Sequence, residues 1–114
     1  MKTIAIDLDG VLARYDGWKG PDHYGDPMPG AVDFLKELIS SDMRVVIFTT
    51  RSGPLLGEWL RKHFPPEILA NLIVTSTKQP AWLQIDDRCF LFRGSFPTIS
   101  EIENFRPWWQ TSKE

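Results

Sequence analysis

The sequence contains very little cysteine, and its only thiol is Cys89. A single thiol cannot form a disulfide within the chain, which is typical of proteins in reducing compartments. No apolar run approaches the roughly 20 residues that a membrane helix needs. Aspartates interrupt the apolar residues near the N-terminus, so we expect no signal peptide and no membrane partner. These absences predict a cytoplasmic protein that folds without disulfide bonds.

The sequence also lacks a strong excess of charge of either sign. Its 13 basic and 15 acidic side chains give a net charge of -2, which argues against tight non-specific binding to long nucleic acids. We find no repeats, no low-complexity segment and no linker that would divide the chain. A chain of 114 residues with 42% hydrophobic side chains can bury a core of its own, so we expect one domain over residues 1–114.

Short apolar runs alternate with amphipathic segments along the chain. Residues 30–41 and 53–64 space their apolar side chains as helices do, and Pro54 suits a first helical turn. The apolar runs are typical of strands buried on both faces; they cover residues 3–8, 44–50, 71–76 and 81–86, with a fifth short candidate at 89–92. The alternation predicts an α/β fold, a three-layer Rossmann-like parallel sheet flanked by helices.

Two further segments complete the pattern. Residues 98–109 predict a last helix that extends to about Phe105. Residues 12–29 are rich in Gly, Pro, Asp and aromatic side chains, which is loop composition, and a loop of this length in a small domain is often functional. Cys89 is expected to be a buried small side chain. Most tryptophans are expected to pack in the core or as a lid, namely Trp59, Trp82, Trp108 and Trp109.

Polar residues follow the carboxyl ends of the four main candidate strands. In parallel α/β sheets, ligands bind beyond these strand ends. The residues concerned are Asp7 and Asp9, then Thr49, Thr50 and Arg51, then Lys78, and finally Asp86 and Asp87. Clustered carboxylates raise each other's pKa unless a cation neutralises them, and oxygen ligands suit Mg²⁺. A carboxylate can also attack a phosphate as a nucleophile, with a metal ion offsetting the repulsion.

The order of these residues resembles the haloacid dehalogenase (HAD) superfamily, in its phosphatase branch. DLDGVL, VVIFTT, Lys78 and IDDR match that family's four motifs in order over residues 4–88. The resemblance implies a Mg²⁺-dependent phosphomonoester hydrolase that acts through an aspartyl-phosphate. It makes Asp7 the nucleophile and Asp9 the general acid that protonates the leaving oxygen and then activates water.

The resemblance also assigns the remaining motif residues. Thr49 would bind the phosphoryl group, with Thr50 as the alternative, and Lys78 would stabilise the nucleophile and the phosphate. Gly10 would permit the tight turn behind the nucleophile. The Mg²⁺ ligands would be Asp7, the backbone carbonyl of Asp9, and Asp86 and Asp87, and which of the last two binds directly stays open.

Arg51 resembles an arginine of polynucleotide phosphatase domains that lies two residues after the Ser/Thr and touches phosphate. The gaps between the motifs are too short for a cap domain, so residues 12–29 are the expected flap over an open site. Arg14 and Trp18 of this flap are candidates for substrate binding, because basic and aromatic side chains can hold a base. The sequence therefore favours a nucleotide or a nucleic-acid end as substrate, without excluding other phosphorylated molecules.

One departure from the family concerns the segment around Lys78. Only a few residues separate 71–76 from 81–86, whereas a parallel crossover takes a dozen or more and the family places a helix there. Either a bare loop crosses or the third strand is misplaced, and Lys78 could be a solvated loop lysine. Two other functions stay open: a non-catalytic HAD-like binding domain, and a phospho-receiver domain, whose acidic pair would come earlier in the chain. The oligomeric state is not readable from the sequence.

Overall fold

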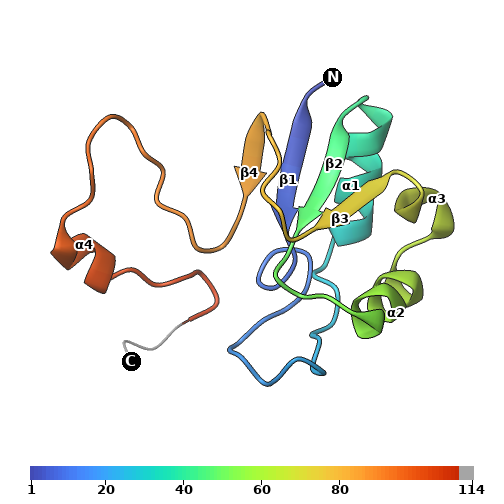
Figure 1. The fold of residues 1–114 in the computed structure, drawn as a ribbon, viewed down its shortest axis with the longest axis horizontal. Coiled ribbons are helices and arrows are strands. Elements are labelled where there is room, and N and C mark those ends of the chain that lie inside the picture. The colour runs from blue at the N-terminus through green and yellow to red at the C-terminus, as the bar shows by residue number, and fades with distance from the viewer. Residues whose placement is uncertain (111–114) are drawn as a thin grey trace.

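The computed structural model describes residues 1–110 and contains four strands and four helices within them. The strands are β1 (Thr3–Asp7), β2 (Arg44–Phe48), β3 (Leu72–Thr75) and β4 (Leu83–Ile85). The helices are α1 (Ala31–Ser40), α2 (Pro54–His63), α3 (Pro66–Leu69) and α4 (Ile99–Glu103). Figure 1 shows the four strands side by side, with their carboxyl ends toward the same edge.

The four strands form one parallel sheet in the order β3-β2-β1-β4. The predicted α/β fold with a parallel sheet flanked by helices is therefore confirmed. Each main apolar run of the sequence contains one of these strands, and α1 and α2 lie within the two segments predicted to be helical. Because β1 lies between β2 and β4, the residues that follow all three strand ends are neighbours in space.

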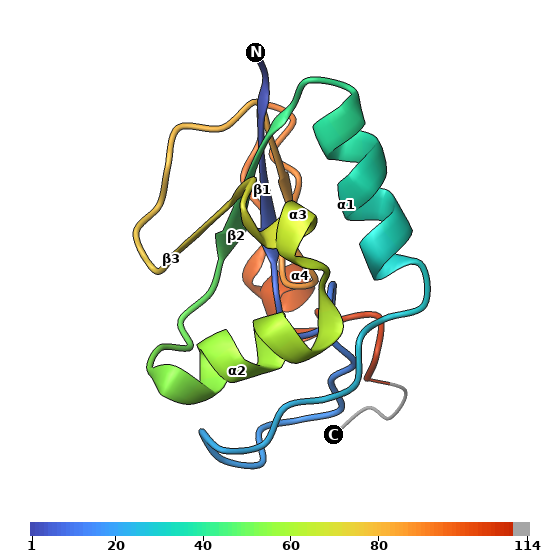
Figure 2. The same cartoon turned by 90° about the vertical axis from the view of Figure 1, so that its right-hand side faces the viewer.

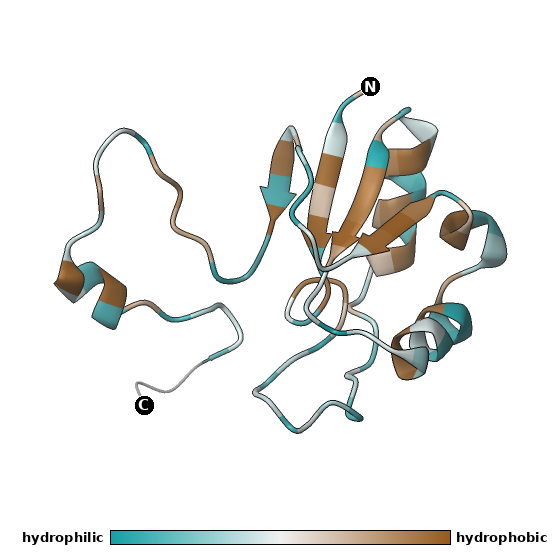
Figure 3. Cartoon of the chain, viewed as in Figure 1, coloured by the Kyte–Doolittle hydropathy of each residue, from teal (hydrophilic) through white to brown (hydrophobic). Residues whose placement is uncertain are grey.

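The core lies between one face of the sheet and the helices. Ile4, Ile6, Val45 and Ile47 alternate along β1 and β2, so their side chains share a face, and all four are buried. The helices contribute Leu35 of α1, with Leu56, Trp59 and Leu60 of α2. Figure 2 shows α1 alongside this face, and Figure 3 shows that the strands are apolar over most of their length.

The other face of the sheet is crossed by a loop. Residues 76–82 connect β3 to β4 without a helix, and Figure 2 shows this loop on the side of the sheet opposite α1. The third strand was correctly placed, so the structure selects the bare crossover of the two alternatives. Ile73, on the face of β3 that looks toward this loop, stays 38% exposed.

Beyond the sheet, the chain forms what we call the C-terminal arm, residues 88–107. The arm leaves the end of β4, leads away from the sheet through α4 and returns (Figure 1). The predicted fifth strand at 89–92 is wrong, because these residues pair with no strand of the described chain. The last helix ends at Glu103 rather than near Phe105, with Asn104 as its C-cap residue.

Two expectations for single side chains are also wrong. Cys89 lies at the start of the arm and is exposed rather than buried. Trp82 is exposed as well, with the ammonium group of Lys2 lying 4.4 Å from the centre of its ring. Among the described residues, no helix combines the length and the apolar character needed to cross a membrane.

Candidate active site

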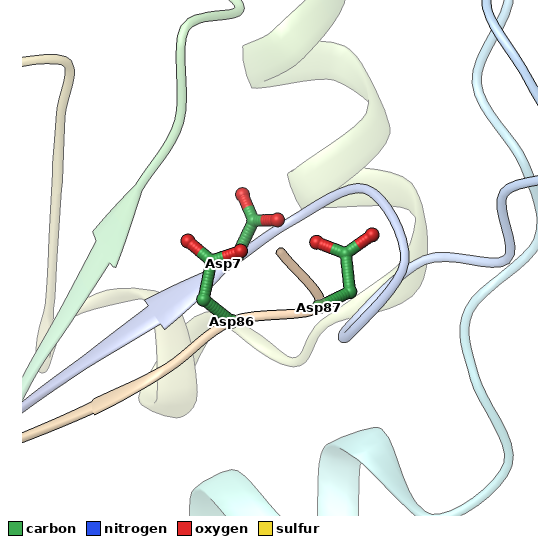
Figure 4. Close-up of side chains that lie close together, drawn as sticks. All are labelled: Asp7, Asp86 and Asp87. Carbon is green, nitrogen blue, oxygen red and sulfur yellow. The ribbon is translucent and has the colours of Figure 1, made fainter. Parts of the chain in front are cut away.

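Three of the four predicted aspartates meet at the carboxyl edge of the sheet. Asp7 is the last residue of β1, and Asp86 and Asp87 directly follow β4, which pairs with β1. One carboxylate oxygen from each lies within 4.8 Å of the other two. Figure 4 shows the three carboxyl groups turned toward a common space. The fourth, Asp9, lies within the turn that follows β1, and its side chain binds another partner.

The three carboxyl groups perturb each other strongly. Burial raises the pKa of Asp7 to about 8, helped by its hydrogen bond with Asp87 and by the negative charges of Asp86 and Asp87. Burial also raises the pKa of Asp86. Although burial acts in the opposite direction, hydrogen bonds from Asp7 and Trp109 lower the pKa of Asp87. At neutral pH the metal-free cluster therefore keeps a proton on Asp7, which is donated to Asp87.

This cluster fits a divalent cation of the hard type. Its donors are oxygens only, and Mg²⁺ is bound in proteins by a few carboxylates together with water. A cation would replace the proton as the charge that allows three carboxyl groups to share the site. Asp7, Asp86 and Asp87 are the side chains that could hold it.

Magnesium should stabilise the protein more at alkaline than at acidic pH. Asp7 has a pKa of about 8 in the folded protein and 3.8 as an isolated group, so without metal the folded state binds the extra proton and stability decreases as pH rises between these values. Mg²⁺ needs the ionised carboxylates. We expect the increase in melting temperature on adding Mg²⁺ to be larger near pH 8.5 than near pH 5.5, measured by differential scanning fluorimetry. An equal increase at both pH values would contradict this assignment.

Gly10 makes the turn that follows the first strand, as the sequence predicted. Its φ of +89° lies in the left-handed region, and a Cβ atom at this position would collide with the carboxyl group of Asp87. The backbone of Gly10 thus approaches the acidic cluster more closely than any other residue type would allow.

Gly10→Ala is expected to destabilise the protein by about 1–3 kcal/mol, the usual cost of a strained backbone at a non-glycine residue. Urea unfolding followed by circular dichroism measures this. Gly57→Ala is the matched control, because Gly57 is inside α2 and an added methyl group would meet only the end of the flexible Arg61 side chain. Equal stability of the two variants would show that the turn does not need glycine.

Asp9 is held by Arg51 rather than by the acidic cluster. Arg51 Nε donates to Asp9 Oδ2 at 2.7 Å, and the Arg51 side chain is only 6% exposed. The other carboxylate oxygen, Asp9 Oδ1, is buried and has no hydrogen-bond partner among the described residues. One oxygen of Asp9 is therefore fixed by a charge, while the second is left without a donor.

Arg51 also ties the flap to the sheet edge. Its guanidinium lies 4.0 Å from the ring centre of Tyr24 and 5.2 Å from that of Trp18, and Nη1 donates to the backbone oxygen of Pro21 at 3.2 Å. Of the predicted substrate-binding residues, Arg51 and Trp18 thus come together next to Asp9. Within the flap, Ala13 pairs with Pro27, so the loop folds back on itself.

The two threonines after β2 have different environments. Thr49 is buried, its backbone N–H donates to the oxygen of Thr75, and its Oγ1 accepts the N–H of Arg51 at 3.1 Å. Because that oxygen already accepts a bond, the hydroxyl hydrogen is left to donate. Thr50 is exposed. Thr49 is accordingly better fixed than Thr50 to present its hydroxyl group at the sheet edge.

Lys78 lies in the bare loop after β3 and is exposed. It forms no hydrogen bond or ion pair with any other described residue, so the structure does not bring it into the arrangement around Asp7. Arg14 lies in the flap and lines a hollow of about 440 Å³ together with Tyr15, Lys19, His23, Trp108 and Trp109. This hollow adjoins the acidic cluster, since Trp109 contacts Asp87.

Sequence reasoning missed the role of the two tryptophans near the end of the chain. Trp108 Nε1 donates to the backbone oxygen of Gly10 at 2.7 Å, and Trp109 Nε1 donates to Asp87 Oδ2 at 2.6 Å. The edge of the Trp109 ring also meets Tyr15 of the flap, with ring centres 4.9 Å apart. Nothing in the local pattern of the sequence indicates this, because the contacts join residues 22 and 98 positions apart. Trp59, by contrast, packs in the core as predicted.

A solved structure resembles this chain over most of its length. It is described as the structure of a conserved protein coded by a locus from Bacteroides thetaiotaomicron, and the match covers 89% of this chain and 85% of that one. The sequences are 29% identical and the TM-score is 0.54, which supports the α/β fold. No protein-family model and no curated protein matches the chain.

Proposed function

We propose that this protein is a Mg²⁺-dependent phosphomonoester hydrolase of the HAD type, in which Asp7 forms an aspartyl-phosphate. The observation that carries the proposal is the meeting of Asp7, Asp86 and Asp87 within 4.8 Å at the carboxyl edge of a parallel sheet. Asp9, in the turn that follows Asp7, forms an ion pair with Arg51. This combination supplies a nucleophile, a metal site and a separate acid–base group.

The cation would be held by Asp7, Asp86 and Asp87, with the backbone carbonyl of Asp9 as a further ligand. When bound, Mg²⁺ would supply a positive charge that offsets the burial and the neighbouring carboxylates that otherwise keep Asp7 protonated, and it would reduce the repulsion of a phosphate. The chain's own residues account for the rest of the reaction. Trp109 fixes the orientation of Asp87, in the manner of the outer hydrogen bonds that orient metal ligands.

In the first step an oxygen of Asp7 attacks the phosphorus atom, and the bond from phosphorus to the leaving alcohol oxygen breaks. For this step Asp9 would carry a proton on Oδ1, the oxygen that Arg51 does not bind, and would give that proton to the leaving oxygen. In the second step Asp9 takes a proton from water, which attacks the phosphorus and releases inorganic phosphate and free Asp7. The same carboxyl group can donate a proton in the first step and accept one in the second, because Arg51 holds its other oxygen in place.

The substrate phosphate would be held by Thr49 and Arg51. Thr49 has a hydroxyl hydrogen to donate, and the guanidinium of Arg51 has more donors than Asp9 and Pro21 use. Lys78 would join only if the loop of residues 76–82 folded inward, so Arg51 is the better placed cation in this structure. The hollow beside Arg14 and Trp109 offers basic and aromatic side chains to the remainder of a nucleotide or nucleic-acid end.

Phosphate release from a panel of substrates tests the proposal. The panel contains nucleoside 5′- and 3′-monophosphates, an oligonucleotide with a 3′-phosphate, a sugar phosphate and a phosphopeptide, each with Mg²⁺ and with a chelator. We expect metal-dependent release, fastest for a nucleotide or an oligonucleotide end. Folded protein that binds Mg²⁺ but releases no phosphate from any member would exclude the hydrolase and favour a non-catalytic binding domain.

A further inference from the structure

The large apolar side chains of the C-terminal arm are not covered by the rest of the chain. Each of its large apolar side chains is at least 42% exposed: Phe90, Leu91, Phe92, Phe96, Ile99, Ile102 and Phe105. Figures 1 and 3 show the arm away from the sheet, with apolar stretches along its length. Scattered single apolar residues are normal on a surface, but seven within sixteen positions of one segment mark an interaction site.

The helix within the arm points to the same conclusion. α4 has five residues and none is buried, yet its start is well built: Thr98 and Glu101 form a reciprocal capping box. Helices this short are unstable in water unless one side packs on something. Ile99 and Ile102 are three residues apart and so lie on one side of α4, and exposed Phe105 follows two residues after its end.

Both ends of the arm are fixed at the acidic site. The arm begins directly after Asp87, and just beyond its other end Trp108 and Trp109 bond to Gly10 and Asp87. The arm is therefore a loop held at both ends rather than a free tail. Holding both ends restricts the conformations that the arm can adopt, which lowers the entropic cost of docking.

From these observations we propose that the arm is a dimer interface, and that its occupant is the arm of a second copy of this chain. The chain has a mass of 13.1 kDa and exposes 7871 Å², whereas a compact monomer of that mass exposes about 6,400 Å². The chain therefore exposes at least roughly 1,000 Å² more surface than a compact monomer would. If two copies covered this extra surface on each other, they would bury more than about 2,000 Å² in total, which is the range of obligate homodimers.

Shape and charge both suit a two-fold pair. The inner side of the arm has a hollow of about 430 Å³, whose apolar lining comes from Phe90, Pro97, Ile102 and Phe105. Phe96 is 85% exposed, and in a symmetric pair Phe96 of each copy enters the hollow of the other. The arm carries three arginines and two glutamates, so copies do not repel each other, and the weak positive charge does not suit a membrane surface or nucleic acid.

Sedimentation equilibrium of the full chain between about 1 and 100 µM tests the proposal. We expect a mass twice that of the chain, and a monomer for Phe96→Ser and for Ile102→Ser, each with an unchanged circular dichroism spectrum because both side chains are exposed. Leu55→Ser is the matched control: Leu55 is an exposed leucine of α2, and this variant should remain a dimer.

Several results would overturn the dimer. A wild-type protein that is monomeric at all concentrations would do so. A compact monomer would mean that the arm covers the sheet of its own chain. An extended monomer would mean that another protein binds the arm. Open-ended oligomers, or dimers of both arm variants, would also exclude the symmetric arm-to-arm contact. The readout is mass rather than turnover, so this result and that of the substrate panel are independent.

Discussion

Asp7→Asn is expected to reduce phosphate release by at least about 10⁴-fold, the scale on which loss of a nucleophile acts in enzymes that form covalent intermediates. An amide cannot form the aspartyl-phosphate, and it removes one ligand of the cation. Because burial keeps Asp7 protonated near neutral pH without metal, asparagine replaces a neutral group of nearly the same shape. We therefore expect the metal-free variant to fold with stability close to that of the wild type.

The measurement is a pre-steady-state and steady-state phosphate assay with the best substrate of the panel. Asp33→Asn is the matched control, since Asp33 is an exposed aspartate in the first turn of α1. It should leave turnover unchanged. Turnover of Asp7→Asn within tenfold of wild type would remove Asp7 from the role of nucleophile, whatever its effect on Mg²⁺ affinity.

Arg51→Met is expected to destabilise the protein by about 3 kcal/mol, because removing one partner of a largely buried ion pair leaves the other charge uncompensated. Arg51 is 6% exposed and bonds to Asp9 at 2.7 Å. Its guanidinium also contacts the ring of Tyr24 and donates a hydrogen bond to the backbone oxygen of Pro21. Methionine keeps much of the apolar length of the side chain, so the loss reports mainly on the charge and its hydrogen bonds.

Urea unfolding measures this change, with Arg61→Met as the control on the exposed surface of α2. The double variant Arg51→Met with Asp9→Asn should recover part of the stability, because it removes both charges. A loss below about 1 kcal/mol would mean that the pair behaves like a surface salt bridge. A lack of any recovery in the double variant would assign the loss to the contacts with the flap instead.

The sequence by itself determined the strands and the position of the aspartates relative to them. Residues such as Ile4, Ile6, Val45 and Ile47 form continuous apolar runs, and such runs indicate strands that are covered on both faces. Once the strands are parallel, their carboxyl ends share an edge. Asp7 and Asp86 were therefore placed together by local pattern and by the rule of parallel pairing, without any knowledge of side-chain contacts.

Tertiary structure alone decided the parts of the site that depend on distant segments. Lys78 lies in a loop whose path is set by the missing crossover helix, and no local pattern shows whether it turns inward. Asp9 pairs with Arg51, 42 positions away, because the turn after β1 lies next to the segment that follows the neighbouring strand β2.

The C-terminal arm is the clearest case in which contacts between distant segments, and not the local sequence pattern, decided the structure. Residues 89–92 have the composition of a strand, but a strand needs a neighbour to satisfy its backbone, and none of the described strands reaches them. Trp109 was expected to pack as core or lid; its ring meets Tyr15 of the flap, and it also donates a hydrogen bond to Asp87 that no local pattern indicates. Local periodicity determines which residues can form a strand or a helix, whereas the partners of their side chains depend on contacts between segments far apart in the chain.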